Sequence, residues 1–132
     1  MNTMQVDGRF RSTAALLLRI AAGCLAGCGL LLASAQAMSL RELRALELSD
    51  KKQGPAYVQY YLVGVLEGVQ EANAQAARAG AKPLFCVNDR RLEPRMAKPL
   101  FDAELQRNKG LYEADMPVQL VMTNALASAY NC

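Results

Sequence analysis

The chain has 132 residues, a formal net charge of +3 and no histidine, and this length leaves room for one domain. Three of the fifteen basic residues and one of the twelve acidic residues precede residue 38, so the balanced remainder gives no electrostatic reason to expect nucleic acid as a partner. The lack of histidine removes the usual general base near neutral pH and the commonest zinc ligand, which excludes most enzyme classes.

Residues 1–37 have the composition of a secretory signal peptide. Three arginines precede residue 20, residues 20–32 are an uncharged apolar run, and Ala35 and Ala37 occupy the two positions that a signal peptidase reads. The pattern predicts a signal peptide that is cleaved after residue 37 and a mature domain over 38–132. The mature domain would then be located in the periplasm.

Two other interpretations of this segment remain open. A membrane anchor over 14–37 would place Arg19 in hydrocarbon, at a cost of about 2.5 to 3.5 kcal/mol. Residues 25–28 also form a bacterial lipoprotein box, which would make Cys28 the lipidated first residue, although the apolar stretch continues to Ala33. Either alternative would attach the protein to a membrane.

The two cysteines of the mature chain, Cys86 and Cys132, are expected to form a disulfide. An even number of cysteines in an oxidising compartment favours pairing. The bridge would close a long loop, which stabilises a small domain by about 4 kcal/mol because the unfolded chain loses entropy. Two free thiols and an intermolecular bridge across a dimer are the alternatives.

Two helices are predicted in the first part of the mature chain. Ser39 followed by Glu42 is a capping box, and leucines follow at helical spacing, so we expect a helix over 40–50. A proline after the next glycine suits a first helical position. It marks the start of a second helix over 55–79, whose apolar residues recur every three and four positions.

Two features of this second helix point to contacts. Gly64 and Gly68 lie one turn apart, and each costs about 1 kcal/mol relative to alanine. We therefore expect another backbone to pack closely against that face. Tyr57, Tyr60 and Tyr61 cannot all face the core of one helix, so at least one is expected near the surface. Exposed tyrosines are common at protein interfaces.

A loop and two more helices are predicted in the second half. Residues 84–87 form a short apolar piece, prolines interrupt the segment after it, and a helix follows over 98–109 with Gly110 as its stop. Asp115 is expected to cap a last helix that has Pro117 in its first turn. No alternating run indicates a strand. The sequence therefore predicts an all-α fold, a small compact bundle of about four helices closed by one disulfide.

The residues offer no catalytic arrangement. Without histidine there is no Ser-His-Asp or Cys-His set. Glu67 and Glu71 lie one turn apart and could act together as a general acid and a general base, but a solvated helix face is the simpler interpretation. The glycines lack the context of a phosphate loop. We therefore expect a non-enzymatic protein, with no cofactor and no metal, that binds another protein.

A basic cluster follows the first mature cysteine. Its members are Arg90, Arg91, Arg95 and Lys98. Asp89 and Glu93 partly neutralise the cluster. The cluster also lacks the interleaved aromatic residues that are typical of proteins that bind single-stranded nucleic acid. The cluster is either a solvated loop or a contact patch for an acidic protein surface.

Residues of the long helix and of the last part of the chain form an ordered pattern. The pattern comprises Tyr61, Gly64, Val65, Glu67 and Gly68, then Phe85 and Cys86, then Ala125, Leu126, Ala129, Tyr130 and Cys132. It resembles the Rap/Tai family of periplasmic immunity proteins, which neutralise amidase effectors of type VI secretion. The resemblance covers residues 57–132. It implies a helical protein, often a homodimer, that plugs the catalytic cleft of a secreted cell-wall amidase.

The resemblance also divides the residues by role. The motif residues of the long helix and of the last helix would be structural, and residues 88–115 would carry partner specificity. We expect the plug at 88–98 or at the turn 108–113. The partner-binding candidates are Asn88, Arg90, Arg91, Arg95, Lys98, Asn108 and Lys109.

Two other function classes compete with immunity. A periplasmic chaperone or stress protein is the first, since small disulfide-closed helical proteins of acid defence look similar in outline. It would bind clients on acidification, and without histidine such a switch would depend on carboxylates at low pH. An accessory subunit of an envelope complex is the second. An amidase toxin gene beside this one would favour immunity.

Overall fold

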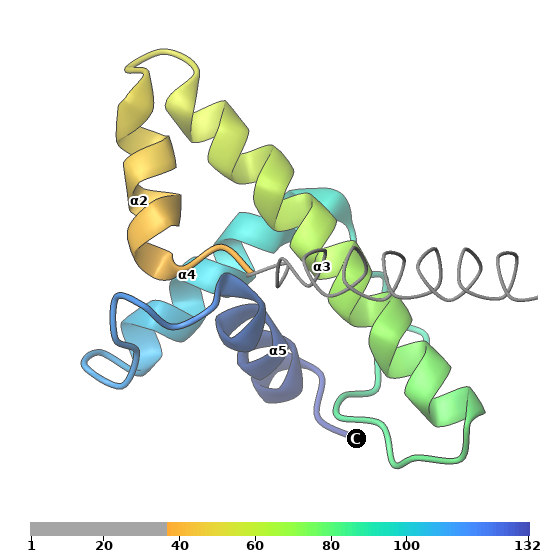
Figure 1. The fold of residues 1–132 in the computed structure, drawn as a ribbon. Helices are drawn as coiled ribbons and strands as arrows, with labels where there is room; N and C mark the ends of the chain where they lie inside the picture. Colours follow the sequence, from red (N-terminus) through yellow and green to blue (C-terminus); the bar gives the residue numbers. More distant parts are fainter. Residues whose placement is uncertain (1–36) are drawn as a thin grey trace, which may run out of the picture. The chain divides into compact units, whose positions relative to one another are not determined.

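Four α-helices and a short 3₁₀ turn make up the part of the chain that the computed structural model describes, residues 37–132. The helices are α2 (Leu40–Ser49), α3 (Gly54–Arg78), α4 (Ala97–Arg107) and α5 (Val118–Ala129), and the turn η2 spans Pro94–Met96 (Figure 1). No strand occurs among these residues, so the predicted all-α fold of about four helices is confirmed. The predicted signal peptide up to residue 36, including Cys28, lies outside the described residues.

The predicted start of α2 is confirmed in detail. The Ser39 hydroxyl accepts a hydrogen bond from the backbone N–H of Glu42, and the Glu42 carboxylate accepts one from the backbone N–H of Ser39. This reciprocal capping satisfies two backbone donors that a helix start otherwise leaves unpaired. Leu40 and Leu43 then face the core, where each is buried.

A tight turn joins α2 to α3 (Figure 1). The Asp50 carboxylate accepts hydrogen bonds from the backbone N–H groups of Lys52 and Gln53, and these bonds hold the pKa of Asp50 below its ordinary value. Gly54 begins α3 so close to α2 that an added Cβ would lie 2.0 Å from the carbonyl oxygen of Glu47. Only glycine fits there, so the close approach of two backbones occurs at this position.

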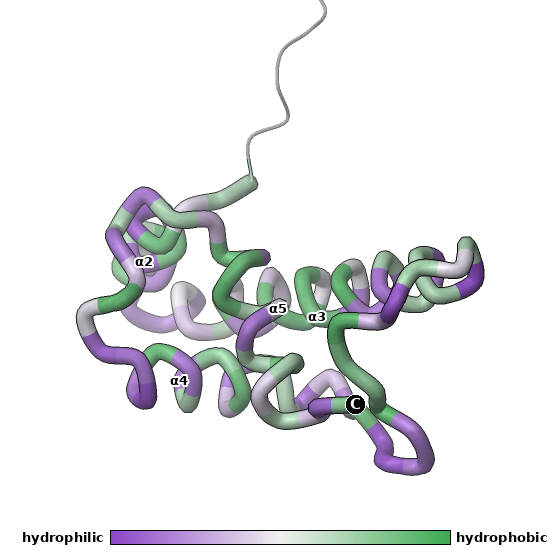
Figure 2. The backbone as a smooth tube through the Cα atoms, turned by 90° about the horizontal axis from the view of Figure 1, so that it is seen from below, coloured by the Kyte–Doolittle hydropathy of each residue, from purple (hydrophilic) through white to green (hydrophobic). Residues whose placement is uncertain are grey.

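The core lies where α3, α4 and α5 pack against one another, while α2 packs on α3. Figure 2 shows this order, with hydrophilic residues concentrated in the connecting loops and on α4. The buried cluster comprises Leu40, Leu43, Val58, Leu62, Val65, Leu66, Phe85, Ala97, Phe101, Val118, Val121, Met122, Leu126 and Tyr130. Helix α5 buries Val118, Val121, Met122, Ala125 and Leu126, because its apolar stripe recurs at three and four residues.

The start of α5 differs from the prediction. Pro117 is the N-cap residue and α5 begins at Val118, and no side chain, including that of Asp115, caps it. Instead, the N–H of Val118 donates to the carbonyl of Met38, and the N–H of Leu40 donates to the carbonyl of Met116. The starts of α2 and α5 therefore satisfy some of each other's backbone groups in place of a side-chain cap.

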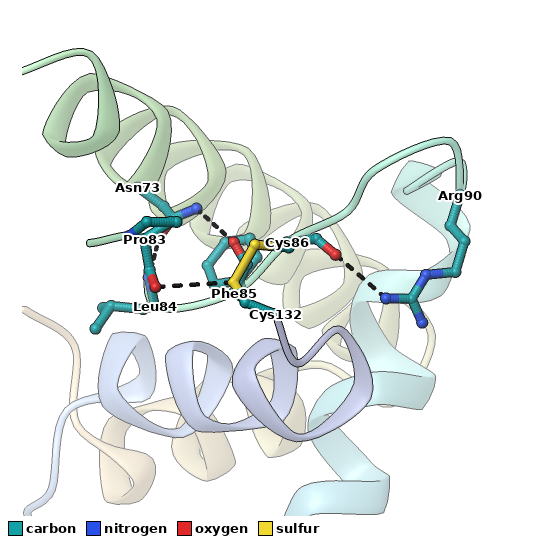
Figure 3. Close-up of a disulfide and its surroundings, with 7 residues drawn as sticks. All are labelled: Asn73, Pro83, Leu84, Phe85, Cys86, Arg90 and Cys132. Carbon is teal, nitrogen blue, oxygen red and sulfur yellow. Dashed lines mark hydrogen bonds between the residues drawn. A yellow bond between two sulfur atoms is a disulfide. The ribbon is translucent and has the colours of Figure 1, made fainter. Parts of the chain in front are cut away.

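The predicted disulfide joins Cys86 to Cys132, with 4.8 Å between the Cα atoms. The segment that carries Cys86 is also attached to α3, because the Asn73 amide donates to the Phe85 carbonyl and accepts from the N–H of Leu84 (Figure 3). The N–H of Cys86 donates to the carbonyl of Tyr130. The bridge and these bonds fix residues 84–86 between α3 and the end of α5.

Candidate partner-binding surface

The seven predicted partner-binding residues lie in two separate segments. Asn88 to Lys98 follow the disulfide, whereas Asn108 and Lys109 follow α4. The two segments differ in how their polar groups are used.

Arg90 is bound by the protein itself. Its guanidinium donates to the carbonyls of Ala129 and Cys86, at 3.2 Å each, and lies 4.6 Å from the ring centroid of Tyr130. A cation at this place satisfies the free carbonyl of Ala129 at the end of α5 and interacts favourably with the negative end of the helix dipole. Figure 3 shows the bond from Arg90 to Cys86 beside the disulfide. Arg90 therefore helps to hold the C-terminal segment against the segment that carries Cys86.

Other basic side chains of this segment are paired locally. The Arg95 guanidinium is 2.6 Å from the Glu93 carboxylate, and the Lys98 ammonium is 2.6 Å from Asp102. Arg91 is exposed, and Asn88 adopts a left-handed backbone conformation with φ of 51°. Most charges of the basic cluster are therefore paired with neighbouring carboxylates or carbonyls. Among residues 37–132, Arg91 is the member of the cluster whose guanidinium has no such partner.

The second segment is organised by a buried carboxylate that the sequence did not single out. Glu104 is only 2 % exposed. It accepts hydrogen bonds from Arg107 at 3.0 Å, from the Asn108 amide at 2.7 Å and from the Tyr112 hydroxyl at 2.6 Å. Burying a carboxylate is costly unless such donors surround it. The three donors therefore belong to one connected network.

Tyr112 extends this network to α5. Its hydroxyl accepts a hydrogen bond of 3.0 Å from the Asn124 amide while it donates to Glu104. Burial raises the pKa of Tyr112, and the hydrogen bond to Glu104 raises it further, whereas Asn124 lowers it. The phenol stays protonated at neutral pH and keeps donating to the carboxylate. Residue 112 is thereby fixed to both α4 and α5.

We call residues 108–117 the α4–α5 loop. Its first part is held by Glu104, and its last part by the start of α2, since the N–H groups of Leu40 and Arg41 donate to the carbonyls of Met116 and Ala114. Between these attachments Gly110 adopts φ of +84°, and the side chain of Leu111 is 60 % exposed. Figure 1 shows the loop projecting beyond the ends of the helices. A leucine is therefore presented to solvent on a well-anchored loop.

Among residues 37–132, no backbone packs closely against Gly64 and Gly68 of α3, contrary to the prediction from the sequence. A Cβ added at Gly64 or at Gly68 would meet no atom within 4 Å, so no described part of the chain packs closely there. The glycines instead lie in an open groove of about 660 Å³, which we call the α3 groove. Its walls are Tyr60, Tyr61, Val65, Val69, Ala72 and Gln119. Tyr60 is 77 % exposed, as expected for at least one of the three tyrosines.

The other motif residues lie in the core or beside it. Val65, Ala125, Leu126 and Tyr130 are buried, and the Tyr61 hydroxyl accepts a hydrogen bond of 3.1 Å from the Gln119 amide. Glu67 is exposed on α3. These positions therefore connect α3 to α5, except for Glu67 and the two glycines, which face solvent.

Within residues 37–132, no group of three or more histidine, cysteine, aspartate or glutamate side chains is placed to hold a metal ion. No helix of this same part is long and apolar enough to cross a membrane. Comparison of the chain with protein-family models, with curated proteins and with solved structures gave no match in any of the three. The surface geometry is therefore the basis for inferring function.

Proposed function

We propose that the protein is a periplasmic immunity protein of the Rap/Tai type, which binds and blocks a peptidoglycan amidase effector of type VI secretion. The α4–α5 loop is the observation that carries this proposal. The loop projects, its tip presents Leu111, and both of its ends are fixed by hydrogen bonds to buried or helical groups. An inhibitor of this kind needs no chemistry of its own, because it only has to fill a cleft and exclude substrate.

The fixed ends of the loop favour tight binding. Ordering a flexible loop on binding costs conformational entropy, and a loop that is ordered beforehand avoids that cost. The Glu104 network and the backbone bonds to α2 supply this order in the free protein. Leu111 then acts as an apolar anchor that enters a pocket of the amidase cleft.

Of the two plug segments expected from the sequence, the structure favours 108–113. In the other segment, Arg90 is bound to Cys86 and Ala129, and Arg95 and Lys98 are paired with acids. Releasing Arg90 would cost the bonds that hold the C-terminal segment, and releasing Arg95 or Lys98 would cost an ion pair. Residues 108–113 can contact a partner without giving up any such bond, because the exposed Leu111 and Lys109 side chains take no part in the Glu104 network.

The disulfide supports the proposed location. Disulfides persist in oxidising compartments such as the bacterial periplasm. The bond between Cys86 and Cys132 closes the domain, and the secretory pattern of residues 1–37 would deliver the chain to that compartment. A cell-wall amidase also acts there.

The test is inhibition of an amidase encoded beside this gene. The purified protein is mixed with the amidase, and peptidoglycan digestion is followed with increasing protein. We expect stoichiometric inhibition at neutral pH, weakened at least tenfold by Leu111→Asp. Leu48→Asp is the matched control, because Leu48 is a surface leucine that is 83 % exposed on α2. Undiminished digestion at every ratio would remove the proposal, and client binding that appears only on acidification would favour the chaperone class.

A further inference from the structure

A pocket of about 130 Å³, which we call the α2–α4 pocket, opens between helices α2 and α4. Both helices pack on α3, but they make at most a weak contact with each other, so a hollow remains between them. Protein interiors are close-packed and contain few hollows larger than a water molecule. A hollow of this size that reaches the core is therefore a candidate site for a small ligand.

The floor of the α2–α4 pocket is part of the hydrophobic core. An apolar cavity of about 150 Å³ can hold a benzene ring, so this pocket suits an apolar group of about four or five carbon atoms. Such a group would leave water for an apolar surface, which is favourable. The side chains of the floor come from three helices and are all buried: Leu40, Leu43, Val58, Leu62 and Phe101.

Charged side chains of both signs surround the mouth of the pocket. Lys98 and Asp102 of α4 satisfy each other, since the ammonium group lies 2.6 Å from the carboxylate. Arg44 and Glu47 of α2 are exposed, and no ion pair among residues 37–132 involves either of them. The α2 side of the mouth therefore offers one cation and one carboxylate to a ligand.

These two charges decide which head group fits. Arg44 and Glu47 are three residues apart, so their side chains are neighbours on the surface of α2. A ligand with a single charge would be attracted by one of them and repelled by the other. A zwitterion satisfies both, because a guanidinium binds a carboxylate through two parallel hydrogen bonds and Glu47 attracts an ammonium group. An ammonium and a carboxylate on one carbon atom are the head group of an α-amino acid.

We propose that the α2–α4 pocket binds a free α-amino acid with a branched aliphatic side chain. The side chain lies on the floor of core residues, the carboxylate contacts Arg44, and the ammonium group contacts Glu47. The ion pair of Lys98 with Asp102 stays closed and forms the opposite side of the mouth. This site does not depend on the proposed inhibition of an amidase.

The test titrates isotope-labelled protein, purified after expression of the full chain, with L-leucine and follows the backbone amide signals by NMR. Leucine should shift signals of the residues of α2 and α4 that line the pocket, and the shifts should saturate. Three analogues each lack one part of leucine: isocaproate lacks the ammonium group, isoamylamine lacks the carboxylate, and glycine lacks the side chain. Each analogue should bind about tenfold more weakly than leucine or not at all.

Variants of the mouth test the two contacts separately. Arg44→Gln and Glu47→Gln should each weaken the binding of leucine by about fivefold or more, because each removes one ionic contact with the head group. Arg41→Gln and Glu67→Gln are the matched controls, since both residues are exposed and neither lines the pocket. The controls should bind leucine as the unchanged protein does. Circular dichroism checks that all four variants fold.

Three results would overturn the proposal. The first is a titration in which leucine shifts no signals, or shifts those along the α3 groove instead of those at the α2–α4 pocket. The second is an analogue with a single charge that binds as tightly as leucine, which would mean that the site recognises an apolar group and not a zwitterion. The third is equal binding of leucine by the mouth variants and by their controls.

Discussion

The segment after the disulfide and the α4–α5 loop are both connections between helices, and both carry basic and polar residues, yet they use them in opposite ways. The first turns its charges onto the protein, with Arg90 on the end of α5 and Lys98 on Asp102. The second turns its polar groups inward to Glu104 and leaves an apolar side chain, Leu111, exposed. A run of charged residues in a sequence therefore does not identify a contact surface, because nearby carbonyls and carboxylates of the same protein can already bind those charged groups.

Removing the disulfide should have the largest effect on stability and should act mainly on the first of these two segments. Replacing both Cys86 and Cys132 with alanine should lower the free energy of unfolding by about 4 kcal/mol, since the unfolded chain regains the entropy of a long loop. Urea denaturation measures the change. Native-state hydrogen exchange should show faster exchange at residues 84–90, with residues 108–112 much less affected. Equal acceleration in both segments would show that the two are not independently held.

Removing the buried carboxylate of Glu104 should have the second largest effect on stability. Glu104→Ala should lower the free energy of unfolding by about 3 kcal/mol, because the partly buried Asn108 and Tyr112 side chains lose their hydrogen-bond acceptor. Glu47→Ala, which removes an exposed carboxylate on α2, should change stability by less than about 0.5 kcal/mol. Hydrogen exchange of residues 108–112 should accelerate in the first variant. Protection that survives Glu104→Ala would mean that the bonds to α2 alone order the loop.

Alkaline pH should weaken the same loop. The folded-state pKa of Tyr112 is raised, so the stability that its protonated hydroxyl contributes is fully present below about pH 10, the ordinary value, and is lost as pH rises through the raised pKa. Tyr112→Phe should lower the free energy of unfolding by about 2 kcal/mol at neutral pH and remove this part of the alkaline loss. Melting curves across alkaline pH measure it. Tyr57→Phe, at an exposed tyrosine, should leave the profile unchanged.

The smallest expected effect belongs to Arg90. Arg90→Ala should lower the free energy of unfolding by about 1 kcal/mol, because two hydrogen bonds to carbonyls and the contact with the Tyr130 ring are lost at an exposed site. Arg91→Ala, one residue later, should have no measurable effect. If the two variants behave alike, Arg90 is not the residue that fastens the end of α5.

Much of the fold could be predicted because its signals are local. The capping box of Ser39 and Glu42 and the pairing of Cys86 with Cys132 depend on a few neighbouring residues or on simple counting. The helix predicted to stop at Gly110 ends earlier, at Arg107, with Asn108 as its C-cap. The start of α5 could not be predicted, since its donors are satisfied by residues that lie far away in sequence. Local capping rules favoured Asp115 there, and tertiary contacts replaced it.

The candidate surface was harder to predict for the same reason. A signal for Glu104 was present, because it continues the spacing of Ala97 and Phe101 along the buried face of α4 and has Asn108 four residues later. An acid within an apolar stripe indicates a buried polar network. For Gly64 and Gly68 the sequence predicted a close backbone contact that residues 37–132 do not make, and the position that needs glycine for packing is Gly54.

The pairing of Ser39 with Pro117 has a consequence for how the protein is processed. Residues 38–41 supply backbone groups that the α4–α5 loop needs, so the beginning of the domain also supports this loop. Trimming by an aminopeptidase past Arg41 would leave the carbonyls of Ala114 and Met116 unpaired and set the loop free. The order of this loop therefore depends on backbone groups at the far end of the domain's sequence.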